Sequence, residues 1–167
     1  MPRTPSSEFA GPEPLLARFM VWVMGAAALG LTACAPGAPD GISKPTLDNA
    51  VNNAIGDPNT CVLIAKPGSA TPVYQFGSHA ACDRSLPACD RAGTRTAAEV
   101  LTSEAQAPAP LAASCPSSPG GDRSVGWTAG RVSDRGLIYV AVMEGPSAPP
   151  GRVVGEKVLH AFRLAGL

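Results

Sequence analysis

Four of the five cysteines in this 167-residue chain lie between residues 61 and 115: Cys61, Cys82, Cys89 and Cys115. Disulfides across this stretch would decide which segments lie side by side, and they persist only outside the reducing cytoplasm. The spacings of 21, 7 and 26 residues contain no Cys-x-x-Cys pair of the kind that binds zinc. We therefore predict two disulfides and no metal site, with three connectivities open at this point.

The N-terminal segment indicates export. Residues 19–31 carry no charge, and Arg3 and Arg18 are the only cations before them. As a helix this apolar segment would be about 20 Å long, which is too short for the ~30 Å hydrocarbon core of a membrane. A basic flank, a short apolar core and small residues after it are typical of a secretory signal peptide. We assign residues 1–33 to such a signal.

The signal ends in Leu31, Thr32, Ala33 and Cys34, which resembles the lipobox of bacterial lipoproteins. The resemblance implies diacylglycerol on the Cys34 sulfur, cleavage before Cys34 and acylation of the new amino terminus. The alternative is an ordinary signal peptide followed by an incidental cysteine. Two or three acyl chains hold a protein firmly, whereas one binds only marginally. Because Ala35 follows the cysteine, rather than the Asp that often retains lipoproteins in the inner membrane, the expected location is the periplasmic face of the envelope, with the outer membrane favoured.

The remainder of the chain suits one domain. Residues 34–45 are rich in Pro and Gly and predict a flexible tether, and residues 46–167 predict a single small domain. Two of the 13 basic and two of the 13 acidic residues precede Cys34, so the part after it is balanced in charge and shows no stripe for nucleic acid. Residues 118–126 contain glycines but no phosphate-loop lysine, and no cofactor is predicted. The expected partners are the membrane, through the lipid on Cys34, and an envelope protein or cell-wall component.

Hydrophobic patterning predicts three helices and two hairpins. The helical segments are residues 45–56, 96–105 and 151–167, and the second begins with the Thr96/Glu99 spacing of a capping box. Strand-like runs predict antiparallel hairpins from residues 60–65 with 72–76 and from residues 124–132 with 137–144. Residues 77–93 and 106–122 are predicted to be loops. The fold class is therefore α+β, with about four antiparallel strands, the N- and C-terminal helices on one face of the sheet, and disulfide-stapled loops.

This arrangement favours one pairing of the cysteines. Cys61 begins the first strand and lies opposite residues near Phe76, and six residues later Cys82 can return to that point. Cys89 and Cys115 then bracket the central helix and tie the middle of the chain to the sheet. We therefore expect the disulfides Cys61–Cys82 and Cys89–Cys115.

Parts of the chain resemble class D serine β-lactamases and related penicillin-recognising domains. Residues 60–93 are similar to the family's opening hairpin, which leads to a Ser-x-x-Lys nucleophile motif. Residues 124–145, "SVGWTAGRVSDRGLIYVAVMEG", resemble its late hairpin, and residues 151–167 resemble its final helix. The resemblance implies one antiparallel sheet with the terminal helices packed on it.

The catalytic groups of that family are missing from the matching positions. Asp90 stands where the nucleophilic serine belongs and Gly93 stands where its lysine belongs. Neither residue can supply the nucleophile or the base of acyl transfer. The Lys-Thr-Gly element would fall near residues 114–118, which contain no lysine. We predict that the domain forms no covalent adduct with β-lactams.

Other candidate sites are weak. His79 and His160 are far apart and fit no ligand or triad pattern, and no Gly-x-Ser-x-Gly motif occurs. The sequence Cys-Asp-Arg recurs at residues 82–84 and 89–91, either as a solvated loop with ion pairs or as a recognition loop held by disulfides. The favoured function is a non-catalytic envelope lipoprotein with a binding or structural role. The alternative is a small periplasmic enzyme or ligand-binding domain with an unrecognised site.

Overall fold

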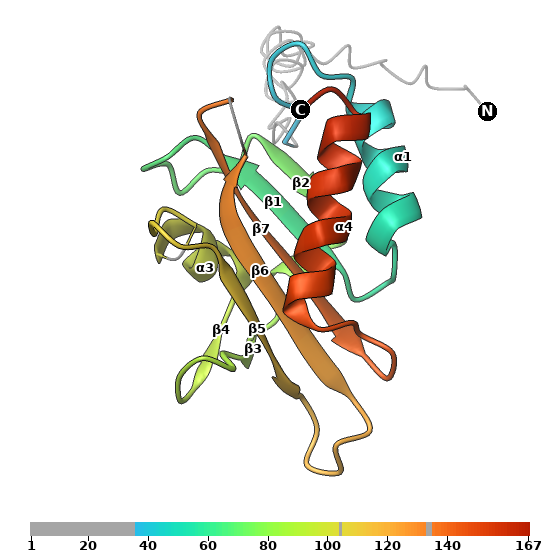
Figure 1. Cartoon of the computed structure of the whole chain (residues 1–167), viewed down its shortest axis with the longest axis vertical. Coiled ribbons are helices and arrows are strands. Elements are labelled where there is room, and N and C mark those ends of the chain that lie inside the picture. The colour runs from blue at the N-terminus through green and yellow to red at the C-terminus, as the bar shows by residue number, and fades with distance from the viewer. Residues whose placement is uncertain (1–35, 104, 133–134) are drawn as a thin grey trace, which may run out of the picture. The chain divides into compact units, whose positions relative to one another are not determined.

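The structure is a computed structural model that describes residues 36–103, 105–132 and 135–167. Its centre is a five-stranded antiparallel sheet with the strand order β2-β1-β7-β6-β5 (Figure 1). In chain order the elements are α1 (Lys44–Ile55), β1 (Cys61–Ala65), β2 (Tyr74–Phe76), α2 (His79–Cys82), β3 (Leu86–Pro87), β4 (Thr94–Arg95), α3 (Ala97–Ser103), β5 (Leu111–Pro116), β6 (Ser124–Val132), β7 (Leu137–Gly145) and α4 (Gly151–Leu164). Strands β3 and β4 pair in a separate two-stranded sheet. The predicted signal peptide and Cys34 lie outside the described residues.

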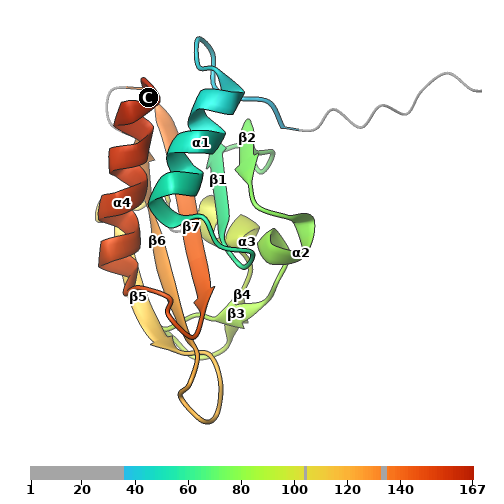
Figure 2. The same ribbon diagram turned by 90° about the vertical axis from the view of Figure 1, so that its right-hand side faces the viewer.

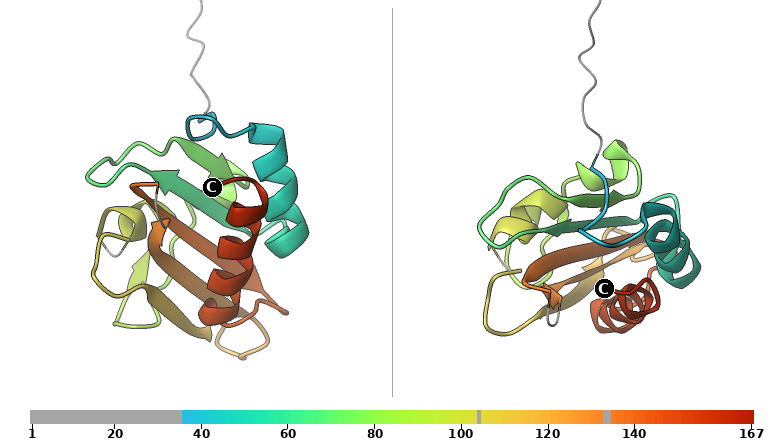
Figure 3. Two further views of the ribbon diagram at one scale, coloured as in Figure 1. Left: turned by 45° about the horizontal axis from the view of Figure 1, so that its top comes forward. Right: turned by 90° about the horizontal axis from the view of Figure 1, so that it is seen from above.

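Helices α1 and α4 lie side by side on one face of the sheet, and α3 covers the other face (Figures 2 and 3). Helix α1 contributes Leu47 and Val51 to the first face, and α4 contributes Val158 and Phe162. The Phe162 ring meets the Tyr139 ring edge-on, with the ring centroids 5.5 Å apart. The α+β class predicted from the sequence is therefore confirmed.

The central strand β7 explains why its sequence is continuously apolar. Successive side chains of a strand point to opposite faces, so Ile138 and Val140 contact the core on the α3 side, while Tyr139 and Ala141 contact the core under α1 and α4. All four side chains are buried. Over residues 138–142 the strand is covered on both faces, so none of these positions gives a polar side chain access to water.

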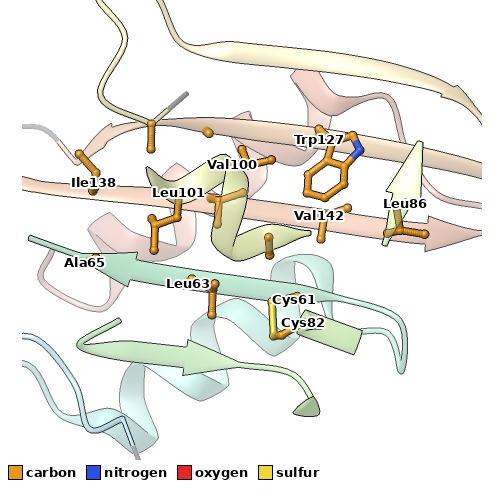
Figure 4. Close-up of a cluster of buried hydrophobic side chains, with 14 of the residues drawn as sticks. Cys61, Leu63, Ala65, Cys82, Leu86, Val100, Leu101, Trp127, Ile138 and Val142 are labelled. Atoms are coloured by element: carbon orange, nitrogen blue, oxygen red, sulfur yellow. A yellow bond between two sulfur atoms is a disulfide. The ribbon is translucent and has the colours of Figure 1, made fainter. Parts of the chain in front are cut away.

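The core on the α3 side gathers around Trp127 and the Cys61–Cys82 disulfide (Figure 4). Val100 and Leu101 of α3 pack into it from above the sheet. Helix α3 begins with the predicted capping box: the Thr96 N–H donates to Glu99 Oε2 over 2.7 Å, and the Glu99 N–H donates to Thr96 Oγ1 over 3.3 Å. These two bonds fix the start of the helix that carries the apolar pair.

A glycine allows the start of α4 to lie close to the backbones of β5 and β6. Helix α4 follows two prolines and starts at Gly151. A Cβ atom at this position would lie 2.1 Å from the Trp127 carbonyl oxygen and 2.5 Å from that of Ala113. Both atoms belong to strand backbones and cannot move aside as a flexible side chain could. The position therefore accepts only glycine at this spacing between helix and sheet.

The main sheet has one edge strand more than the roughly four strands expected from the sequence. Residues 111–116, expected to lie in a loop, form β5 and pair with β6 from Leu111 opposite Ala129 to Pro116 opposite Ser124. The segment is rich in Ala and Ser, which have little intrinsic strand preference, so its sequence carries no strand signal. The first predicted loop, residues 77–93, likewise contains α2 and β3. Both hairpins expected from the sequence are present, as β1–β2 and β6–β7.

The described part of the predicted tether lies against the domain. Helix α1 starts at Lys44, before the expected domain boundary at residue 46. Pro39 is buried, and Ile42 packs against the core under α1 and α4. A turn in which the Ile42 N–H donates to the Pro39 carbonyl over 3.0 Å connects them. The chain thus contacts the domain from a point within a few residues of Cys34.

Candidate functional site

Both disulfides pair as expected from the sequence. Cys61 and Cys82 join the start of β1 to the end of α2, with their Cα atoms 5.0 Å apart. Cys89 and Cys115 join the loop after β3 to the edge strand β5, with their Cα atoms 5.3 Å apart. The segment between Cys82 and Arg95, named here the stapled loop, is therefore attached to the sheet at two points.

Arg95 anchors the stapled loop to the sheet. It is 6% exposed, and its guanidinium lies 5.3 Å from the centroid of the Trp127 ring. It forms an ion pair of 3.0 Å with Asp90 and donates to the Ala88 carbonyl over 2.9 Å. The Trp127 Nε1–H in turn donates to the Pro87 carbonyl over 2.7 Å. The cation over the aromatic ring and the partly buried ion pair both help to hold the loop against the sheet.

Asp90 and Gly93 have structural roles in the stapled loop. The Asp90 carboxylate is paired with both Arg91 and Arg95 at 3.0 Å. Burial acts to raise the pKa of Asp90, but the hydrogen bond from Arg91 and the charge of Arg95 outweigh it and lower that pKa below its usual value. Gly93 has a φ of 93°, in the left-handed region that glycine adopts without strain. It therefore serves the turn between β3 and β4.

A polar hollow of about 430 Å³ lies between the stapled loop and α3. Arg91 and Thr94 contribute to its wall from the loop, and Glu99, Thr102 and Ser103 contribute from α3. Arg91 and Glu99 are exposed at the hollow, where the Arg91 guanidinium is paired with Asp90 and the Glu99 carboxylate caps α3. Its lining, rich in hydroxyls and charges, suits a polar or ionic group.

The first Cys-Asp-Arg repeat leads to a different cluster, around Glu144 at the end of β7. Glu144 is 6% exposed and accepts hydrogen bonds from Arg123 Nε at 2.8 Å and Nη2 at 2.6 Å. Arg84 Nη1 at 3.1 Å and Ser117 Oγ at 2.7 Å complete its partners. The Arg123 bonds, aided by Ser117 and Arg84 and opposed by burial, lower the pKa of Glu144 to about 2.

No local sequence pattern predicts this cluster, because its members are far apart in the chain. Arg84, Ser117 and Arg123 precede Glu144 by 60, 27 and 21 residues. One signal was present: Glu144 interrupts an otherwise apolar strand, and a carboxylate there needs a partner. The cluster ties the stapled loop, the β5–β6 connection and β7 together.

An apolar pocket of about 520 Å³ lies at the end of the sheet near α1's start, and we name it the end pocket. Its wall is formed by apolar residues from the segment before α1, from the β1–β2 turn, from β7 and from the last residue of the chain, namely Pro39, Ile42, Val73, Leu137 and Leu167. Lys66, Arg135 and Asp40 also line it. Arg135 donates a hydrogen bond to the Gly166 carbonyl.

The two histidines do not come together. His79 begins α2 and His160 lies in α4. Within the described ranges, no group of three or more His, Cys, Asp or Glu residues is placed to hold a metal ion. None of the helices formed by the described residues is long and apolar enough to cross a membrane.

No protein family, no curated protein and no solved structure matches this chain.

Proposed function

We propose that this protein is a lipid-anchored lipoprotein of the bacterial envelope whose domain binds a partner without catalysing a reaction. The observation that carries the proposal is the sequence Leu31–Cys34, which follows an uncharged apolar segment and precedes a domain with two disulfides. Disulfides suit a domain that reaches the oxidising periplasm. Ala35 after the cysteine favours the outer membrane.

The chemistry of the stapled loop supports a binding role over an enzymatic one. Asp90 and Gly93 replace the serine and lysine of the penicillin-recognising domains that the sequence resembles, and the Asp90 carboxylate is held by two arginines. The sheet with α1 and α4 on one face is the arrangement which that resemblance implies. The proposal therefore includes an evolutionary relationship to those domains, in which this domain has lost the groups for acyl transfer.

The polar hollow beside the stapled loop is the surface we propose for the partner. A disulfide, an ion pair and the Arg95–Trp127 contact hold the loop before any partner arrives. A loop that is already ordered loses little entropy on binding, which favours affinity. The exposed Arg91 and Glu99 suit the polar groups of an envelope protein or of cell-wall material.

The lipid anchor is tested by metabolic labelling. In cells grown with an alkyne analogue of palmitate, we expect the wild-type protein to become labelled and Cys34→Ser to carry no label, because the thioether needs the sulfur. Thr32→Ser keeps a small residue in the signal and should retain the label. Equal labelling of the wild type and Cys34→Ser would refute the lipoprotein assignment.

The binding surface is tested by cross-linking of the full-length protein in cells. We expect a cross-linked envelope partner that is lost in Arg91→Glu, because the substitution reverses a charge on the hollow. Arg152→Glu changes an equally basic residue on α4 and should keep the cross-link. A cross-link unaffected by Arg91→Glu would place the partner elsewhere, and turnover of a small molecule by the purified protein would support the enzyme alternative.

A further inference from the structure

We propose that the end pocket binds an anionic phospholipid of the membrane in which Cys34 is anchored, with Lys66 and Arg135 at the phosphate and the apolar wall against the glycerol and first acyl carbons. The proposal rests on the lipid anchor proposed above. It assigns the end pocket a role that differs from that of the hollow beside the stapled loop.

Covalent geometry keeps this pocket close to the anchor. Ala38, which lines the pocket, follows Cys34 by four residues. Four residues of fully extended chain span at most about 14 Å. An acylated Cys34 lies in the headgroup layer, which is on the order of 5–8 Å deep on each side of the hydrocarbon core. Because Pro39 and Ile42 also pack on the domain, the pocket is held near the membrane surface and cannot drift away on a long linker.

The lining of the pocket matches a phospholipid better than a soluble anion. Lys66 and Arg135 stand beside one acidic side chain, Asp40, so these three side chains carry a net positive charge. The hydrogen bond from Arg135 to the Gly166 carbonyl holds the guanidinium at the pocket. The wall also contains apolar side chains, including those of Ile42 and Leu137, which form no hydrogen bonds to a hydrated ion. An amphiphile with a phosphate beside apolar carbons satisfies both parts.

The test uses the full acylated protein, purified in detergent and reconstituted into phosphatidylcholine vesicles that contain a photoreactive phosphatidylglycerol. After illumination, peptide mapping should place the lipid on residues 36–43, 66–73 or 135–137. Lys66→Glu combined with Arg135→Glu should lower that yield by at least about 25-fold, since each of the two lost cations strengthens attraction to an anionic surface on the order of fivefold. Lys157→Glu, on the exposed side of α4, is the matched control and should leave the yield unchanged.

Each other outcome overturns the proposal in a distinguishable way. Mass spectrometry of the same sample reports the acyl groups on Cys34. An acylated Cys34 with no lipid on the pocket peptides would overturn the pocket and leave the anchor standing. An unmodified Cys34 would overturn both. If inorganic phosphate in the buffer abolishes the cross-link, the pocket is a site for soluble anions and the lipid assignment is wrong.

Discussion

Replacing both cysteines of the Cys89–Cys115 disulfide by alanine is expected to lower the free energy of unfolding by about 3–4 kcal/mol at 25 °C. The bridge closes a loop with a sequence separation of 26 residues. Opening it restores conformational freedom to the unfolded chain and frees the stapled loop from β5. The Cys61–Cys82 bridge has a separation of 21 residues and should contribute nearly as much. Together these contributions are a large share of a typical total of about 5–15 kcal/mol.

Urea unfolding of the oxidised wild type and of each double-alanine variant measures these losses. Ser114→Ala, on the exposed side of β5 next to Cys115, is the matched control and should change stability by less than about 0.5 kcal/mol. Non-reducing peptide mapping checks the pairing itself. A peptide that joins Cys82 to Cys89, or a double variant as stable as the wild type, would contradict the role assigned to the bridges.

Glu144→Gln is expected to lower the free energy of unfolding by about 2 kcal/mol at neutral pH. The substitution keeps the size of the side chain but removes the charge that neutralises Arg84 and Arg123. Glu144 is 6% exposed, whereas the side chains of Arg84 and Arg123 are 40% and 36% exposed. Water can therefore reach the two arginines, and the loss is smaller than for a fully buried pair.

The effect of Glu144→Gln should depend on pH in one direction. The folded-state pKa of Glu144 is lowered to about 2 from 4.5. The stabilisation is therefore fully present above about pH 5 and is lost as the pH falls from 4.5 towards 2, where the folded state also takes up the proton. The gap between wild type and Glu144→Gln should close over this range. Chemical denaturation at a series of pH values measures it.

Glu156→Gln supplies the control for Glu144→Gln. Glu156 pairs with Arg152 across one turn of α4, but its side chain is 62% exposed. An exposed pair of this kind contributes less than about 0.5 kcal/mol. Equal losses in the two variants, or a gap that persists at pH 2, would show that the charge of Glu144 does not hold the cluster together.

Local signals in the sequence predicted most of the helices and strands. The capping box of Thr96 and Glu99 started α3 because both groups of that motif are within four residues of each other. The signal of β7 is an unbroken apolar run and that of α4 is a 3.6-residue period, and both are properties of neighbouring residues. The disulfide pairing followed once the first hairpin brought Cys82 back to Cys61.

These local patterns did not predict contacts between residues that are distant in the sequence. Trp127 and Tyr139 belong to adjacent strands, yet they face opposite cores because Trp127 is opposite Val142 and Tyr139 is opposite Gly130 in the register. Strand β5 is ordered by hydrogen bonds to β6 and by its disulfide, while its own alanines and serine have no strand preference.

Local sequence patterns thus determined α1, α3, α4 and the two hairpins, because a capping box, a helical stripe or a strand-like run lies within neighbouring residues. The tertiary structure alone decided the Glu144 cluster and the end pocket. Glu144 meets Arg84 across 60 residues, and the end pocket joins the segment before α1 to two turns and to Leu167. Contacts of this kind depend on strand order and register, which arise from the packing of the whole sheet. No local sequence pattern predicts them.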